Sequence, residues 1–330
     1  MTVPIHDPLL AQPRPWRDDL VALAIVLGIA ALLYVIFPDN LALFTRMVSI
    51  MLLVLSLDLI TGYAGIATLG HATLFGVGAY ASGIVAVRWG VTDPLAMLVV
   101  GAVAGSAAGV LSSLIILRGN GLGQLVLSIA ILRLIQEAAN KASSLTGGSD
   151  GLAGIAPTAV FGLFRFDLYG RTAFVLAVVV LAATFILLRV IVRSPFGMLC
   201  RGIREDKIRI RAMGASVFGT LVKAYAIAGM VAGLGGALYT INGRVVGLDS
   251  LSFNLSAEAL VMLVVGGVGN LSGALVGSFV FVLCEHFVSS INPFHWLTII
   301  GVLLVAIVLF APQGLSGASF RIWSLIRSRP

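Results

Sequence analysis

Charged side chains are scarce in this 330-residue sequence, of which Asp, Glu, Lys and Arg make up 11%. A soluble globular domain carries about a quarter charged residues, so this composition excludes one. Hydrophobic residues make up 59%, and the mean hydropathy is +1.08. Apolar runs of about 20 residues, the length that a membrane-spanning helix needs, recur along the chain. These runs do not alternate with polar residues, which excludes a membrane β-barrel.

Cysteine is rare as well, since only Cys200 and Cys284 are present. The first falls in a basic stretch and the second inside an apolar run. We therefore expect no structural disulfide.

Signatures of enzymes are also missing. The chain has no Gly-x-x-x-x-Gly-Lys-Ser/Thr loop for nucleotide binding, so any ATP hydrolysis must come from another chain. It has no His-Glu-x-x-His motif, and Glu285-His286 alone makes no metal site. Residues 147–151 fit Gly-x-Ser-x-Gly, but they lie between membrane spans rather than at a strand-to-helix turn. We expect no catalytic residue, no cofactor and no metal.

The apolar runs predict an all-α, polytopic membrane protein with about ten transmembrane helices. A cytoplasmic tail, 1–19, precedes a transmembrane domain, 20–312, and a second cytoplasmic tail, 313–330, follows. The third run is rich in glycine and contains His71, and the eighth is short, so either could be broken or re-entrant. The expected spans are 20–37, 41–60, 63–87, 94–117, 121–140, 172–192, 217–241, 257–270, 272–290 and 296–311.

Basic residues predict the orientation. The formal charge is +7, from 21 Lys and Arg against 14 Asp and Glu. The Lys and Arg residues lie mainly between the spans, most densely in 189–211. This distribution is typical of cytoplasmic loops and not of nucleic-acid binding. Both termini are then cytoplasmic, the loop 141–171 is external, and the protein is a multi-pass protein of the cell inner (plasma) membrane.

The same topology gives the second to fifth spans an orientation opposite to that of the seventh to tenth. Such inverted repeats are common in transporters, where the solute pathway lies at the interface between the repeats. The sequence therefore predicts two inverted repeats.

The segment 193–216 predicts a short amphipathic helix on the cytoplasmic side. Ser194 is placed to cap it and Gly214 to end it, while apolar residues recur at helical spacing in between. Glu205 and Arg209 are spaced to form an ion pair. Such a helix is suited to docking into a groove of a soluble partner. A basic loop that only determines the topology is the alternative.

Polar residues within the spans are few. His71 either lines a pathway or has a structural role, and the glycines around it either allow close packing or an unwound backbone beside a cavity. Arg46, Asp58, Arg133, Glu137 and Glu258 are expected near helix ends, where long side chains reach the membrane surface. Glu285 lies deeper.

Several motifs resemble the permeases of branched-chain amino-acid ABC transporters, the LivM type in particular. They run in order from about residue 50 to about residue 315. They are Gly62-Tyr63-Ala64-Gly65, Leu69-Gly70-His71-Ala72, Phe75-Gly76-Val77-Gly78-Ala79-Tyr80, Thr146-Gly147-Gly148-Ser149-Asp150-Gly151-Leu152, Ser194-Pro195-Phe196-Gly197, Arg204-Glu205-Asp206, Met213-Gly214, Gly229 to Tyr239, Gly266-Gly267-Val268-Gly269 and Phe310-Ala311-Pro312-Gln313-Gly314-Leu315.

The resemblance implies a permease subunit of an importer for branched-chain amino acids or related small polar solutes. It implies three partners: ATP-binding cassette subunits, a second permease subunit that forms a heterodimer with this chain, and an extracytoplasmic solute-binding protein. An ion-coupled secondary transporter or channel, and a membrane-embedded enzyme, are the alternatives.

The expected site residues form three groups. They are the ATPase-coupling residues Ser194, Gly197, Arg201, Arg204, Glu205, Asp206 and Gly214, the pathway candidates Gly65, Gly70, His71, Gly76 and Gly78, and the external-loop residues Thr146, Gly147, Gly148 and Asp150.

Overall fold

A computed structural model describes residues 16–159, 170–291 and 301 of the chain, and these residues are mainly helical. Six segments in this part of the chain are long and apolar enough to cross a membrane, and three shorter apolar helices accompany them. The prediction of a polytopic helical membrane protein is confirmed. The tenth expected span, 296–311, lies largely outside the described residues. The apolar helices are α1 (Trp16–Ile36), α2 (Leu41–Leu57), α3 (Ala72–Arg88), α4 (Pro94–Ile116), α5 (Leu122–Lys141), α7 (Arg171–Arg193), α10 (Val217–Gly243), α11 (Phe253–Gly266) and α12 (Leu271–Ile291).

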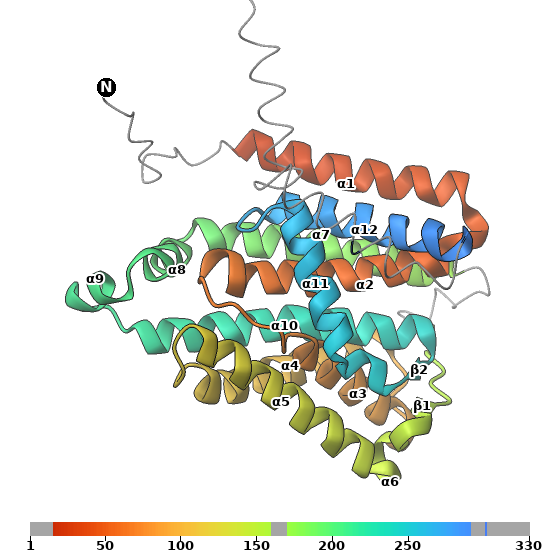
Figure 1. Ribbon diagram of the computed structural model, residues 1–330. Coiled ribbons are helices and arrows are strands. Elements are labelled where there is room, and N and C mark those ends of the chain that lie inside the picture. The colour runs from red at the N-terminus through yellow and green to blue at the C-terminus, as the bar shows by residue number, and fades with distance from the viewer. Residues whose placement is uncertain (1–15, 160–169, 292–300, 302–330) are drawn as a thin grey trace, which may run out of the picture.

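Shorter elements lie at the two ends of this bundle. At one end are α8 (Pro195–Glu205) and α9 (Lys207–Ala212), and at the other is α6 (Ser143–Thr146). Beside α6, β1 (Leu152–Ala153) pairs antiparallel with β2 (Val245–Val246), and this two-stranded ladder is an addition to the all-α prediction. In Figure 1 these two sets of elements lie at opposite ends of the bundle, as expected of the segments 193–216 and 141–171. Which end faces the cytoplasm stays a prediction.

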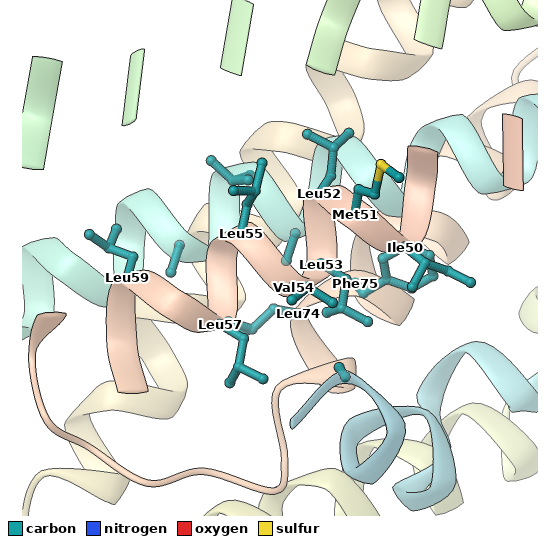
Figure 2. Packing of buried hydrophobic residues seen from close by; sticks show 14 of the residues in the cluster. Ile50, Met51, Leu52, Leu53, Val54, Leu55, Leu57, Leu59, Leu74 and Phe75 are labelled. Carbon is teal, nitrogen blue, oxygen red and sulfur yellow. The ribbon is translucent and has the colours of Figure 1, made fainter. Parts of the chain in front are cut away.

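Helix α2 lies at the centre of the molecule. All of its side chains except those of Ala42, Leu43 and Arg46 are buried, because the helix is apolar on every face. Figure 2 shows its leucines pointing in all directions, with Leu74 and Phe75 of α3 packed beside them. A π-helical turn, Asp58–Tyr63, continues α2.

The third expected span is broken, and its start at residue 63 is wrong. Residues 64–71 are irregular, and the helix begins only at Ala72. Side chains satisfy the freed backbone groups, as a membrane interior requires. Leu69 N donates to Ser128 Oγ (3.2 Å), and Ala72 N donates to Ser256 Oγ of α11 (2.9 Å). These two polar partners of the segment therefore come from distant parts of the sequence.

A similar break follows α10. The chain leaves α10 at Arg244, passes through β2 and a 3₁₀ turn, Leu248–Leu251, and then forms α11, which is as short as expected. Thus α2 and α10 are each followed by an irregular segment and a short helix. This is the arrangement that two repeats of the same fold would produce, and in Figure 1 α2 and α10 run antiparallel.

Helices α4 and α10 pack closely along rows of glycine. Gly101, Gly105 and Gly109 recur at every fourth residue and face Gly229 and Gly233. A Cβ atom at Gly105 would lie 2.2 Å from the Gly229 carbonyl oxygen, and one at Gly233 would lie 2.1 Å from that of Gly101. Small residues at this spacing let membrane helices approach closely. This contact holds the two expected repeats together.

Candidate functional site

The segment 193–216 forms two helices, α8 and α9, and not the single helix that was predicted. The break is at Asp206, which has extended backbone angles (φ −153°, ψ 100°). Its Oδ1 accepts hydrogen bonds from Ile208 N (2.9 Å) and Arg209 N (3.0 Å). A carboxylate in this position caps a new helix. These hydrogen bonds hold the pKa of the exposed Asp206 carboxyl below its usual value.

The ends of the segment follow the prediction only in part. Ser194 lies at the N-cap of α8, but its hydroxyl donates to the Ile191 carbonyl (2.6 Å) and caps no amide. Gly214 (φ +86°) ends α9 as expected. The predicted Glu205–Arg209 ion pair is wrong, since among the described residues Arg209 pairs with Asp206 instead (3.9 Å).

One face of α8 is seated on the body of the protein. Cys200 and Ile203 on this face are fully buried, and burial raises the pKa of the Cys200 thiol to about 11. The Arg201 guanidinium lies 5.1 Å from the centre of the Tyr63 ring, and the Arg204 guanidinium donates to the Gly62 carbonyl oxygen. Gly197 makes the close turn from α7, because a Cβ there would lie 2.2 Å from the Val192 oxygen.

Arg204 lies at a junction that joins α8 to two other parts of the chain. Asp58 Oδ1 accepts a hydrogen bond from Gly269 N (2.7 Å), which fixes the turn between α11 and α12 on the end of α2. A Cβ at Gly62 would lie 2.0 Å from Asp58 Oδ1, and one at Gly65 would lie 2.6 Å from Arg204 Cγ. We call Asp58, Gly62, Gly65, Arg204 and Gly269 the Arg204 junction.

The sequence analysis identified three of the segments that meet at the Arg204 junction, but it did not predict that they are in contact. The glycine motifs at 62–65 and 266–269 and the coupling segment were separate features of the sequence. Asp58 was expected near a helix end, reaching the surface, but it is fully buried. One feature of the sequence could have identified Asp58 as a site residue. It is a carboxylate inside an otherwise apolar run, where ionisable residues usually have a specific role.

His71 lies buried between the two expected repeats. Its Nε2 is 2.8 Å from Ser56 Oγ of α2. Beside it is a small cavity with room for about one water molecule. Polar atoms of His71 (Nδ1), Thr73 (Oγ1) and Tyr225 (OH) are buried around this cavity with no hydrogen-bond partner among the described residues. Helices α3, α4 and α5 of the first expected repeat and α10 of the second therefore share one polar cavity.

The other pathway candidates pack closely against neighbouring segments. A Cβ at Gly70 would lie 2.1 Å from the Ser128 oxygen, one at Gly76 would lie 2.5 Å from Leu251 side-chain atoms, and one at Gly78 would lie 2.4 Å from the Gly233 Cα. Close packing is thus the observed use of these glycines in this conformation, while Gly65 belongs to the Arg204 junction.

The external-loop motif forms a closed turn. Gly147 and Gly148 have positive φ angles (81° and 60°), which glycine adopts readily. The Thr146 hydroxyl is 2.5 Å from the Ala139 oxygen and 2.9 Å from the Ala142 oxygen, and it accepts a hydrogen bond from Gly148 N (3.2 Å). Asp150 is exposed, and the Gly-x-Ser-x-Gly string lies in a 3₁₀ turn rather than a nucleophile elbow.

Two groups of ionisable residues differ from expectation. Arg133 lies near the middle of α5 and not at its end. Arg46 of α2, Glu258 of α11 and Glu285 of α12 lie close enough for their charges to interact, although the sequence showed them only as separate residues.

The larger of the two described cavities, between α1, α2, α7 and α12, is lined almost entirely by apolar side chains. It does not suit a polar solute and lies away from His71 and the Arg204 junction.

A family model described as the permease component of branched-chain amino acid transport systems matches residues 40–309. A relative named "High-affinity branched-chain amino acid transport system permease protein LivM", from Escherichia coli strain K12, is 24% identical over 282 residues. That alignment covers 79% of this chain and 66% of the relative. The protein of the same name from Salmonella typhimurium is 22% identical, over 91% of this chain and 75% of its own length.

A probable LivH permease protein from Methanocaldococcus jannaschii is also similar, with 25% identity over 49% of this chain and 54% of its own length. No solved structure matches the chain.

Proposed function

Because the chain belongs to the family of permease components of branched-chain amino acid transport systems, we propose that it is the membrane-spanning subunit of an ABC importer. Its solutes are branched-chain amino acids or related small polar molecules, which it moves into the cell across the inner membrane. The observation that carries this proposal is the seating of α8 on the Arg204 junction. That contact joins a helix at one end of the bundle to the central helix α2.

The chain takes its energy from a separate ATP-binding subunit, because it has no nucleotide-binding loop of its own. The docking element is α8 together with α9. Met198, Ile208 and Met213 there are 59%, 81% and 75% exposed. Large apolar side chains on short, charged helices suit insertion into a groove of a soluble partner. The coupling residues are those of the sequence prediction, Ser194, Gly197, Arg201, Arg204, Glu205, Asp206 and Gly214.

A movement of α8 reaches the membrane part through two contacts of the Arg204 junction. Arg204 holds the π-helical turn at the end of α2 through Gly62, and Asp58 holds the turn between α11 and α12 through Gly269. Shifting α8 therefore moves both expected repeats together. We assign Asp58 and Gly269 to the coupling machinery as well.

The solute passes between the two expected repeats beside His71. The polar cavity shared by α3, α4, α5 and α10 is the closed constriction of that pathway. The nearby glycines, Gly70, Gly76 and Gly78, hold the surrounding helices close. Binding there is weak, because the cavity is lined by neutral groups, and selection takes place on the external solute-binding protein.

The remaining partners follow from the same proposal. A second permease subunit completes the membrane part. The solute-binding protein docks at the external end, near Thr146, Gly147, Gly148 and Asp150. Both termini and the segment 193–216 lie in the cytoplasm.

The test is co-purification and transport of the intact complex. Purifying the tagged chain in detergent should recover ATP-binding subunits. Reversing Glu205 and Asp206 to Lys should leave the abundance of the chain near normal, because neither site is buried, but should abolish uptake and solute-stimulated ATPase activity. Asp206→Asn is the matched control, since its oxygen can still cap α9. Uptake that continues without ATP would instead support an ion-coupled transporter.

A further inference from the structure

Helix α5 carries charged side chains on an exposed face. Leu122, Val126, Ala130, Arg133 and Glu137 follow one another at intervals of three or four residues, so they share one side of the helix. All five are exposed in the described part of the chain. We call them the Arg133 face. The opposite side, with Ser128 and Ile131, is buried and lines the His71 cavity.

Arg133 lies well away from both ends of α5. It is 11 residues after Leu122 and 8 before Lys141, in a helix of 20 residues. At 1.5 Å per residue it lies about 16 Å from one end and about 12 Å from the other. Beyond the far end, the Arg88 guanidinium contacts the Ser144 carbonyl, at the level where α3 also ends. Arg133 therefore lies about two helical turns or more from either end of α5.

The Arg133 charge has no counter-ion among the described residues. Its guanidinium donates to the neutral Gln136 Oε1 (3.0 Å), while Glu137 pairs with Lys141 instead (3.6 Å). Within these residues α5 is both the least apolar and the least buried of the six long helices. A helix that is exposed to lipid needs apolar side chains on its exposed face. The exposed faces of α4 and α7 fit lipid, with Val103 and Val179 at comparable depth.

We propose that the Arg133 face is the contact surface for the second permease subunit. The proposal rests on the proposed function, and it adds where the two permeases meet and what the partner must supply. The partner has an apolar surface opposite Leu122 and Val126 and an anionic group, a carboxylate, opposite Arg133. Because the buried side of α5 lines the His71 cavity, the subunit contact and the solute constriction share one helix.

The contact is tested by photocrosslinking in membranes that contain the whole transporter. The photoreactive residue p-benzoylphenylalanine is placed at Ala130 on the Arg133 face, or at Val103 on α4 as a control for lipid exposure. We expect the chain with the probe at 130 to crosslink to a second permease chain, of this or another sequence, and the probe at 103 to label lipid alone. Crosslinking of the 130 probe only to lipid, to another segment of the same chain, or to a non-permease subunit would refute the proposal.

The charge is tested by substitution. Arg133→Leu should lower the recovery of the second permease with the tagged chain by roughly tenfold or more, because the partner's carboxylate loses its counter-ion. Arg133→Lys should restore much of it. Arg118→Leu, at the exposed connection between α4 and α5, is the control and should leave recovery unchanged. Equal recovery with Arg133→Leu and Arg118→Leu would contradict the charge pairing. Recovery of ATP-binding subunits reports separately on the proposed function.

Discussion

At the residue scale, Gly62 shows how little space the Arg204 junction leaves. Its missing side chain makes room for the Asp58 carboxylate, and its carbonyl receives the Arg204 guanidinium. A methyl group at this position would lie 2.6 Å from Gly269 N as well. No flexible side chain can relieve that overlap, because Gly269 N is backbone.

We therefore expect Gly62→Ala to destabilise the complex by about 1–3 kcal/mol, the usual cost of overpacking, and to abolish uptake. The measurement is the thermal unfolding midpoint of the purified complex, together with transport in vesicles. Gly28→Ala in α1 is the matched control, since a Cβ there meets nothing within 4 Å. Equal midpoints and equal uptake for the two variants would show that the junction is loosely packed.

His71 provides a second prediction at this scale. Glutamine has a polar end group that can still bond to Ser56 Oγ, so His71→Gln should assemble normally. It changes the polar atoms around the cavity, however, so the relative uptake of different solutes should shift. Competition uptake assays measure the shift, and the yield of assembled complex measures folding. A lower yield with unchanged preference would give His71 a structural role only.

At the scale of elements, periodicity and apolar length predict the long helices well. The expected span 94–117 corresponds to α4, Pro94–Ile116, and the expected span 172–192 to α7, Arg171–Arg193. Both are bounded by residues with local signals, such as Asp93, whose side chain caps α4. The predicted start of the third span, at residue 63, was wrong. Residues 64–71 bond to side chains that are far away in sequence, such as Ser128 and Ser256, so no local pattern shows the break.

The coupling segment shows the same limit. Apolar spacing across 199–213 is compatible with one helix, but Asp206 bonds its carboxylate to two amides ahead of it and starts a second helix. Whether the segment forms one helix or two depends on the local competition between the Asp206 side chain and the helix backbone for hydrogen bonds. The spacing of the apolar residues is the same in both cases.

The buried face of α8 offers a direct reporter of its seating. Cys200 is fully buried, and burial raises its thiol pKa to about 11, so little thiolate is present at neutral pH. We expect Cys200 to resist N-ethylmaleimide in the chain that keeps Arg204, expressed without the ATP-binding subunits so that only the chain itself can protect the thiol. Arg204→Ala should release α8, and labelling should then rise. Cys284 is replaced by Ala in both proteins, so that Cys200 is the sole cysteine of the chain.

Met198→Cys, on the exposed side of α8, serves as the control and is labelled in the same chain without ATP-binding subunits, which would cover this side chain. It should label readily in both backgrounds once Cys200 is also replaced by Ala. If Cys200 stays unlabelled after Arg204→Ala, other contacts hold α8 in place and Arg204 is not needed for its seating.

At the scale of the whole molecule, the fold class and the family follow from the sequence. The contacts that bring the residues of the Arg204 junction together do not. Asp58, Arg204 and Gly269 are separated by long stretches of chain, and no local pattern shows that they touch. The glycines of α4 carry a usable signal, since the four-residue spacing of Gly101, Gly105 and Gly109 is typical of close helix packing. Periodic features were thus predictable, and contacts between distant irregular segments were not.

The orientation of the whole molecule is the last prediction. Arg201, Arg204, Lys207, Arg209 and Arg211 lie on α8 and α9, and basic loops of this kind stay in the cytoplasm. Ser149 is exposed and lies between α6 and β1 in the sequence, and these two elements are at the other end of the bundle (Figure 1). We therefore expect the two ends to face opposite sides of the membrane.

In a chain with Cys200 and Cys284 replaced by Ala, Ser149→Cys should react in intact cells with a thiol reagent that cannot cross the membrane. The side chain of Met213, at the α8–α9 end, is 75% exposed in this chain. In cells that lack the ATP-binding subunits, which would otherwise cover it, Met213→Cys should react only after the cells are opened. Equal labelling of both in opened cells is the control for accessibility. The reverse pattern in intact cells would place α8 and α9 outside. An ATP-binding subunit could not then reach them, so the coupling role proposed for Arg204 would fail together with the orientation.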